Sequence, residues 1–218
     1  PQELVRASEE LSTSEWIDTF RQAAALGVLH LHLSGGEPAS RRDLVELTEA
    51  AVSLGLYTNL ITSGVGLTET RIDRLSAAGL DHVQLSIQGT KAASADHVSG
   101  YDGGHARKMA AAGWLRQAGI PLTLNAVCHQ QNMDEIEDIV SLAVELDAHR
   151  VEIATVQFHG WAMLNQQALM PTMAQVSEAT KIVETMRARL EGVLVIDYVP
   201  ADYYATYPKA CMGGWGRA

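Results

Sequence analysis

The sequence predicts an α/β fold built on a parallel sheet. Six apolar, β-branched runs alternate with six windows of 3.6-residue hydrophobic spacing along the 218 residues. Successive runs begin roughly 25 to 40 residues apart, which is the spacing of the right-handed βαβ units that form parallel sheets. A closed eight-fold barrel typically needs about 250 residues, and no G-x-G-x-x-G motif follows a run as it does in dinucleotide-binding sheets. A partial (β/α)6 barrel of the TIM type therefore fits better than a doubly wound open sheet.

The strands are placed where apolar residues are bounded by polar residues or glycine, and the helices where apolar residues recur on one face. We expect strands over 28–33, 56–61, 82–87, 121–127, 150–156 and 193–196. We expect helices around 16–23, 44–54, 72–75, 109–115, 136–143 and 176–190. Capping boxes are expected to start four helices: Ser12 with Glu15, Ser40 with Asp43, Asn132 with Glu135, and Thr172 with Gln175. Left-handed caps that lead from a helix into the next strand are expected at Gly27, Gly55, Gly79 and Gly119.

Composition narrows the classes of protein to consider. Lys plus Arg number 16 and Asp plus Glu number 26, so the net charge is −10 and we expect no nucleic-acid partner. No run approaches 18 uncharged apolar residues and the first residues carry no signal-peptide pattern, so we expect no membrane span and a cytoplasmic location. Because the chain begins at Pro1 and stops at Ala218, we expect a segment of a longer protein, truncated at both ends.

Polar and small residues follow the apolar runs. They include Ser34 to Pro38 after the first run, Thr62 and Ser63 after the second, Ser86, Asn125 and Gln157. In parallel α/β folds ligands bind at the carboxyl ends of the strands, so this set suits a polar small molecule laid across the barrel mouth.

The segment Gly35-Gly36-Glu37-Pro38 is the most informative of these strand ends. Two residues without Cβ let backbone carbonyls approach a ligand, and the adjacent carboxylate favours an ammonium group. The alternative from spacing alone is a glycine turn that leads into the next helix. A strand that ends in Gly-Gly-Glu-Pro within a (β/α)6 pattern resembles the radical S-adenosylmethionine (SAM) superfamily, in which this motif holds the amino group of the methionine moiety.

Two later segments resemble one family within that superfamily. They are Gln157 to Asn165 with Leu169 to Thr172, and Tyr207 to Arg217. They are similar to the enzymes that cross-link the precursor peptide PqqA in pyrroloquinoline quinone biosynthesis. The resemblance implies that a reduced [4Fe-4S] cluster cleaves SAM to a 5′-deoxyadenosyl radical. That radical takes hydrogen from a glutamate side chain, which then joins carbon to carbon with a tyrosine ring.

The resemblance also implies roles for individual residues. The methionine amino group would be held by Gly35, Gly36, Glu37 and Pro38, and the same pocket would be lined by Thr62 and Ser63. Ser86 would meet the carboxylate or the ribose, and ribose or adenine would contact Asn125 and Gln157. Gln88 stands where many members of the superfamily have an acidic residue.

The loop Cys-x-x-x-Cys-x-x-Cys that holds the cluster in this superfamily does not occur in the sequence, so this segment alone is expected to be inactive. The resemblance divides the chain into a barrel over 1–197, without its first strand and cluster loop, and the start of a region over 198–218 that bridges to an auxiliary-cluster (SPASM) domain. Cys211 is expected to ligate an auxiliary iron-sulfur cluster, whereas Cys128 is expected to be a buried core thiol. The implied partners are PqqA, its chaperone PqqD and an electron-donor protein.

Other interpretations stay open. A sulfatase-maturing or thioether-forming radical enzyme would share Gly35 to Pro38 but not the segment around Gln157, and a chain without the cluster loop could only bind SAM or a peptide. An aldolase barrel is a poorer choice because no Lys ends a strand. His30 and His32 share a strand face but lack a third metal ligand, so they are expected to be core or interface residues. The acidic stretch 134–145 is expected to be a solvated helix face.

Overall fold

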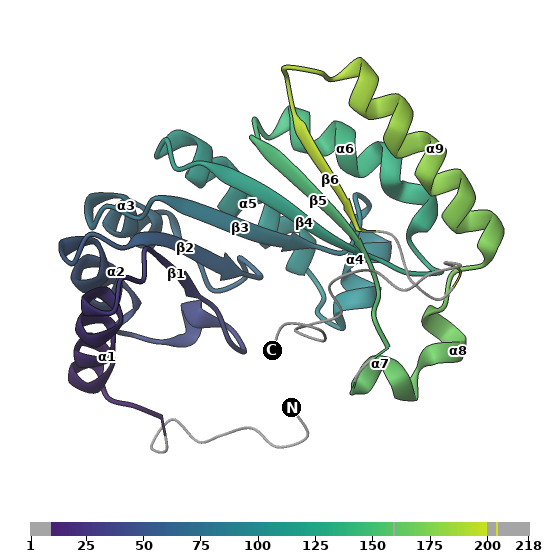
Figure 1. The fold of residues 1–218 in the computed structure, drawn as a ribbon. Helices are drawn as coiled ribbons and strands as arrows, with labels where there is room; N and C mark the ends of the chain where they lie inside the picture. The colour runs from purple at the N-terminus through teal and green to yellow at the C-terminus, as the bar shows by residue number, and fades with distance from the viewer. Residues whose placement is uncertain (1–9, 159, 200–203, 205–218) are drawn as a thin grey trace.

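Six parallel strands form one sheet in the computed structural model, which describes residues 10–158, 160–199 and 204 (Figure 1). Each strand pairs with the next along the chain, so the order in the sheet is the order in the sequence. Within the described residues, β1 and β6 form the two edges, and the partial barrel is not closed. The strands are β1 (His30–Leu33), β2 (Tyr57–Thr62), β3 (His82–Ile87), β4 (Leu122–Cys128), β5 (Arg150–Thr155) and β6 (Val195–Val199).

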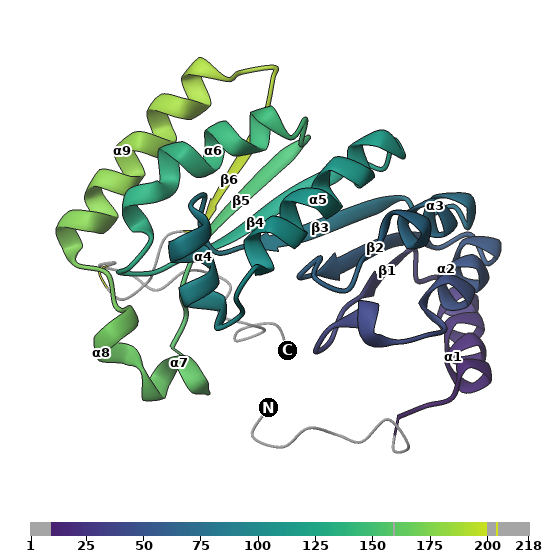
Figure 2. The same ribbon diagram turned by 180° about the vertical axis from the view of Figure 1, so that it is seen from behind.

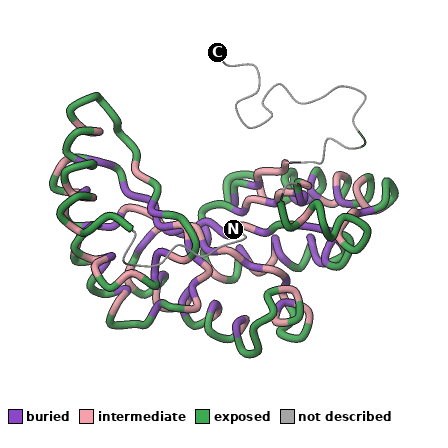
Figure 3. The backbone as a smooth tube through the Cα atoms, turned by 90° about the horizontal axis from the view of Figure 1, so that it is seen from below, coloured by how far each residue is buried: buried purple, intermediate pink, exposed green. Residues whose placement is uncertain are grey.

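Helices join the strands, as the hydrophobic spacing predicted. The long connecting helices are α1 (Thr13–Ala25), α2 (Leu44–Ser53), α3 (Glu69–Ala77), α5 (Gly104–Gln117), α6 (Ile136–Glu145) and α9 (Met173–Arg189). Figure 2 shows α5, α6 and α9 in front of the sheet, and Figure 3 shows the chain bent into an open arch. The predicted α/β fold with a partial barrel is therefore confirmed, and the barrel is not closed among the described residues.

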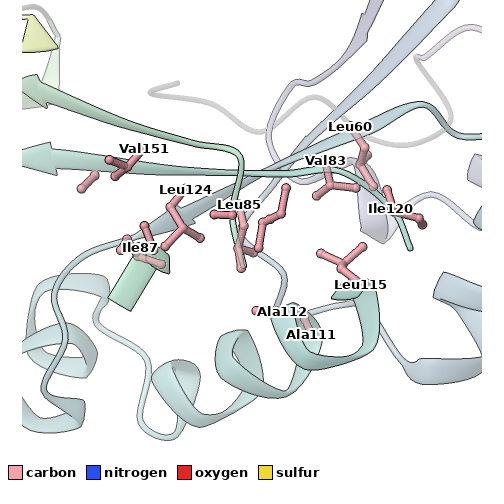
Figure 4. Close-up of a cluster of buried hydrophobic side chains, with 14 of the residues drawn as sticks. Leu60, Val83, Leu85, Ile87, Ala111, Ala112, Leu115, Ile120, Leu124 and Val151 are labelled. Atoms are coloured by element: carbon pink, nitrogen blue, oxygen red, sulfur yellow. The ribbon is translucent and has the colours of Figure 1, made fainter. Parts of the chain in front are cut away.

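The sheet is anchored to this helical layer by alternate side chains. Val83, Leu85 and Ile87 of β3 are buried, and Figure 4 shows them in one cluster with the α5 residues Ala111 and Leu115. The intervening β3 residues are polar and half-buried, with their side chains on the opposite face. That second face carries little helical cover in Figure 1.

Short elements that the sequence did not predict lie near the carboxyl ends of the strands. The 3₁₀ turn η2 (Pro38–Ser40) follows β1, α4 (Ala92–Ser99) follows β3, and η3 (Met133–Glu135) follows β4. Two four-residue helices, α7 (Trp161–Leu164) and α8 (Gln166–Leu169), follow β5. Among the described residues no helix is both long and apolar enough to cross a membrane.

Of the four predicted capping boxes, two are confirmed and two are wrong. The boxes at Ser12 and Thr172 are confirmed, and the four helix-ending glycines all have positive φ. The box predicted at Ser40 is wrong because the side chain of Asp43 accepts hydrogen bonds from Thr13 and Arg41. The box predicted at Asn132 is also wrong because its side chain bonds the backbone of neighbouring loops. In both cases tertiary partners take the side chain that local spacing had assigned to a cap.

Candidate functional site

The loop after β1 is fixed to the end of β2 by the carboxylate of Glu37. One carboxylate oxygen accepts from the Ala39 N–H (2.9 Å) and from the Thr62 hydroxyl (2.6 Å). The other accepts from the N–H (2.8 Å) and the hydroxyl (2.5 Å) of Ser63. Four donors converge on one half-buried carboxylate, so the predicted neighbours Glu37, Thr62 and Ser63 are brought into direct contact.

These donors also keep Glu37 ionised. Burial raises the pKa of Glu37, but the hydrogen bonds from Ser63, Thr62 and the Ala39 N–H outweigh it, so the pKa of Glu37 lies below its usual value. The site therefore carries a fixed negative charge at neutral pH.

Glycine and proline shape the loop on either side of this charge. Gly35 has φ of +133°, a conformation that L side chains rarely adopt, and the Gly35 and Gly36 residues are exposed. Pro38 begins η2, and Arg71 of α3 donates to the carbonyl oxygens of Ala39 and Arg41 at the exit of that turn. The loop presents bare backbone to a ligand while both of its ends are held.

The other predicted site residues lie at the same end of the sheet. Ser86 of β3 and Asn125 of β4 are register partners on neighbouring strands, and both are half-buried. Gln157 is exposed two residues beyond β5. The structure therefore places Ser86 near the end of β3, Asn125 in the middle of β4 and Gln157 beyond the end of β5, and their contacts with a ligand remain predictions.

Two buried residues that sequence reasoning did not assign to the site fix the loop after β3. The amide of Asn132 donates to the Gln88 carbonyl oxygen (2.9 Å) and accepts from the His129 N–H (2.7 Å). The Glu135 carboxylate accepts from the N–H of Thr90 (2.7 Å) and from the hydroxyl of Ser94 (2.8 Å). Glu135 is 4% exposed, so the prediction of a solvated face is wrong at this residue. The segment from Gln88 to Thr90 is thus held by η3 and by the Asn132 residue that precedes it.

A third missed residue is Lys108 in the second turn of α5. Lys108 is 4% exposed, and its ammonium donates to the Ser86 carbonyl oxygen (3.1 Å) and to the Gln88 side-chain oxygen. A signal was present in the sequence, since Lys108 shares the i, i+3, i+4, i+7 stripe of Ala111, Ala112 and Leu115. A lysine on an apolar stripe indicates either a buried partner or a ligand.

Histidines and cysteines do not form a metal centre in the described part of the chain, where no group of three potential ligands gathers. His30 and His32 are exposed rather than core residues, and the His32 ring bonds the Asn59 amide at 3.0 Å. Cys128 is fully buried as predicted, and burial together with the charge of Glu135 raises its pKa to about 12. The predicted cluster ligand Cys211 lies outside the described residues.

A pocket of about 680 Å³ opens beside the β1 edge, within the range of small-molecule sites. Its walls include the loop from Ser34 to Pro38, together with apolar side chains of β1, α1 and α2 such as Leu33, Phe20 and Leu47. The glycine-rich loop therefore lines part of this pocket.

The fold is an α/β barrel that is not closed among the described residues, and the Gly-Gly-Glu-Pro loop follows β1 at its carboxyl end. These two features together are typical of one superfamily of α/β barrels. Residues 3–143 match the family model described as the Radical SAM superfamily, so the chain belongs to that superfamily.

The chain is also 68% identical over 217 residues to "PqqA peptide cyclase" of Rhizobium meliloti (strain 1021), which covers 100% of this chain and 58% of the relative. The chain thus spans somewhat more than half the length of that relative.

Solved structures share the fold. Streptococcus suis SuiB bound to S-adenosylmethionine aligns with a TM-score of 0.76 at 20% identity, over 94% of this chain and 47% of that one. SuiB bound to precursor peptide SuiA aligns with a TM-score of 0.74 at 20% identity, over 91% and 44% of the two chains.

Proposed function

We propose that this chain is the SAM-binding part of a PqqA peptide cyclase, which joins a glutamate and a tyrosine side chain of PqqA by a carbon-carbon bond. The observation that carries the proposal is the 68% identity, which extends over the whole chain, to a relative of that name. The proposal for the substrate peptide is supported by the fold shared with SuiB, a protein solved with its precursor peptide SuiA.

The described residues fit the amino-acid end of SAM. Exposed Gly35 and Gly36 offer backbone carbonyls beside the fixed negative charge of Glu37, an arrangement that suits an ammonium group. We assign Pro38 to the rigid exit of this loop and Thr62 and Ser63 to its support. We assign Ser86 to the carboxylate or the ribose, and Asn125 and Gln157 to the ribose or the adenine. With a [4Fe-4S] cluster, bound SAM would supply the hydrogen-abstracting species for the reaction.

The described residues do not fit the cluster itself. Cys128 is buried and its thiol is protonated at neutral pH, so it offers no thiolate. We place the cluster ligands in the parts of the longer protein that this chain does not cover, and we propose that a preceding strand pairs with the free edge of β1. We assign 1–197 to the barrel and 198–218, with Cys211 as an auxiliary-cluster ligand, to the link with a SPASM domain.

The proposed enzyme is cytoplasmic and works on PqqA delivered by its chaperone PqqD, with electrons from a donor protein. The test is anaerobic incubation of the full-length, iron-reconstituted protein with SAM, a strong reductant, PqqA and PqqD. We expect 5′-deoxyadenosine together with a PqqA mass lowered by two hydrogens. Deoxyadenosine with unaltered PqqA would move the substrate to another peptide, and the absence of both products would refute the proposal.

A further inference from the structure

Arg71 of α3 is a half-buried cation without an ion-pair partner among the described residues. Its guanidinium donates instead to two backbone carbonyl oxygens, those of Ala39 and Arg41. Burial lowers the pKa of Arg71 and the nearby charge of Glu37 raises it, but an arginine side chain stays protonated in a folded protein. The charge of Arg71 is therefore used to hold backbone rather than to neutralise a carboxylate.

The two carbonyl groups lie at the exit of the loop that follows β1. Ala39 is the middle residue of η2, and Arg41 caps its end, where the Arg41 N–H donates to the Pro38 carbonyl at 3.1 Å. A guanidinium is a planar fork that reaches two acceptors at once, whereas the ammonium of lysine is a single point charge. The Arg71 side chain thus closes the carboxyl end of η2, as the Glu37 side chain closes its amino end.

The connection from β2 to α3 packs against the same turn. A Cβ added at Gly66 in this connection would lie 3.2 Å from the Ala39 Cβ and 3.6 Å from the Ala39 carbonyl oxygen. The hydroxyl of Thr68 caps α3 by accepting from the Arg71 N–H at 3.3 Å, so the backbone that carries the guanidinium is itself fixed. Arg71 therefore joins η2 to a connection that already touches it.

The residues before η2 need such ties from outside the loop. Gly35 and Gly36 are exposed, and Gly35 has φ of +133°. Glycine loses more conformational freedom than any other residue when it is ordered, so the loop does not hold one conformation by itself. Glu37 ties it to the exit of β2, and Arg71 ties it to α3.

We propose that Arg71 is a positioning residue for SAM, because its guanidinium holds the loop from Gly35 to Pro38 in the conformation that binds the methionine ammonium. The proposal rests on the proposed function, since it requires SAM as the ligand. Arg71 acts through Ala39 and Arg41 and not by contact with SAM. When the loop leaves the binding conformation, the apparent Kd for SAM rises by the factor by which the fraction of competent protein falls.

The first test is native-state hydrogen exchange of the full-length, iron-reconstituted protein under anaerobic conditions without SAM. The amides of Ser40 and Arg41 donate the backbone hydrogen bonds of η2. We expect Arg71→Ala to speed their exchange about ten-fold, the lower end of the value of a hydrogen bond to a charged group. The amide of Leu47 in α2 should be unaffected. Arg74→Ala is the matched control, because Arg74 is exposed on the same helix and carries the same charge.

The second test is SAM binding to the same proteins, measured by calorimetry. We expect Arg71→Ala to weaken SAM binding about ten-fold and Arg71→Lys about three-fold, because one ammonium replaces a two-pronged donor. Millimolar guanidinium chloride should restore most of the affinity of Arg71→Ala, whereas the same concentration of sodium chloride should not. Arg74→Ala should bind SAM as the wild type does.

Unchanged SAM binding in Arg71→Ala would overturn the proposal, and so would wild-type affinity in Arg71→Lys if Arg71→Ala does not fold. Weaker SAM binding that comes with faster exchange at Leu47, or that guanidinium does not reverse, would assign Arg71 to the stability of the whole fold and would also overturn it. Wild-type protein that does not bind SAM would remove the proposed function together with this inference. Wild-type binding with no effect of Arg71 would remove this inference alone.

Discussion

Replacement of Glu37 by glutamine tests whether one carboxylate organises the loop after β1. The carboxylate oxygens face two backbone donors, the N–H groups of Ala39 and Ser63, on opposite sides. A glutamine amide has one oxygen, so in either orientation its NH₂ group faces one of these N–H groups. The Ser63 hydroxyl can rotate to accept, but a backbone N–H cannot.

The magnitude follows from these contacts. A hydrogen bond to a charged group contributes about 1.5–3 kcal/mol, and an unpaired buried donor has a cost of the same order. Since Glu37 is half-buried, solvent reduces the effect, and we expect the loop to open more easily by about 1–2 kcal/mol. That corresponds to roughly five- to thirty-fold faster amide hydrogen exchange at Ala39 and Ser63.

The assay is native-state hydrogen exchange of the Glu37→Gln variant read at these two amides, with Glu49→Gln on the exposed side of α2 as the control. The pH dependence has a definite sign. Because the folded pKa of Glu37 is lowered, its contribution is fully present above the unfolded pKa and is lost as the pH falls through the folded pKa. Unchanged exchange at Ala39 and Ser63 in the variant would refute the idea that Glu37 holds the loop.

Two further predictions concern buried groups behind the site. Asn132→Leu removes the acceptor of the His129 N–H and the donor to the Gln88 carbonyl, and we expect it to lower the free energy of unfolding by about 2–4 kcal/mol in denaturant titrations, with the exposed Gln131→Leu as control. If Asn132→Leu lowers the free energy of unfolding no more than Gln131→Leu does, the hydrogen bonds of Asn132 do not stabilise the fold. The pKa of Cys128 is raised to about 12, so the folded protein at pH 8 should resist iodoacetamide at Cys128 while the unfolded chain reacts, as peptide mapping would show. Labelling of Cys128 in the folded protein at the unfolded rate would contradict its burial.

The sequence predicted the strands well because a parallel sheet covered by helices needs near-continuous apolar runs, and such runs are local. The strand over His82–Ile87 agrees at both ends with the structure. The last strand is shifted from 193–196 to Val195–Val199 because the chain first forms a turn after α9, where the Val193 N–H bonds the Leu190 carbonyl.

The candidate site was predicted less completely, for a physical reason. Gly35 to Glu37 could be found from residue type and spacing, because the backbone geometry that they provide is local. The partners of Lys108 and Glu135 could not be assigned in this way, since each bonds a residue far away in the sequence, 22 residues for the Lys108 bond to Ser86 and 45 for the Glu135 bond to Thr90. Long-range ties of this kind depend on the register of strands that sequence spacing alone does not give.

The charges of Glu37 and Lys108 are each fixed to a different strand. Glu37 is bonded to the end of β2 and Lys108 to the end of β3, so the separation of anion and cation is set by the pairing of β2 with β3. Gly64 lies between them with φ of +78°, and a Cβ there would approach the Leu85 Cδ1 to 2.5 Å. A larger residue at Gly64 would push the exit of β2 away from β3 and separate the two charges. A residue without a Cβ at the exit of β2 therefore keeps the Glu37 and Lys108 side chains close to one another.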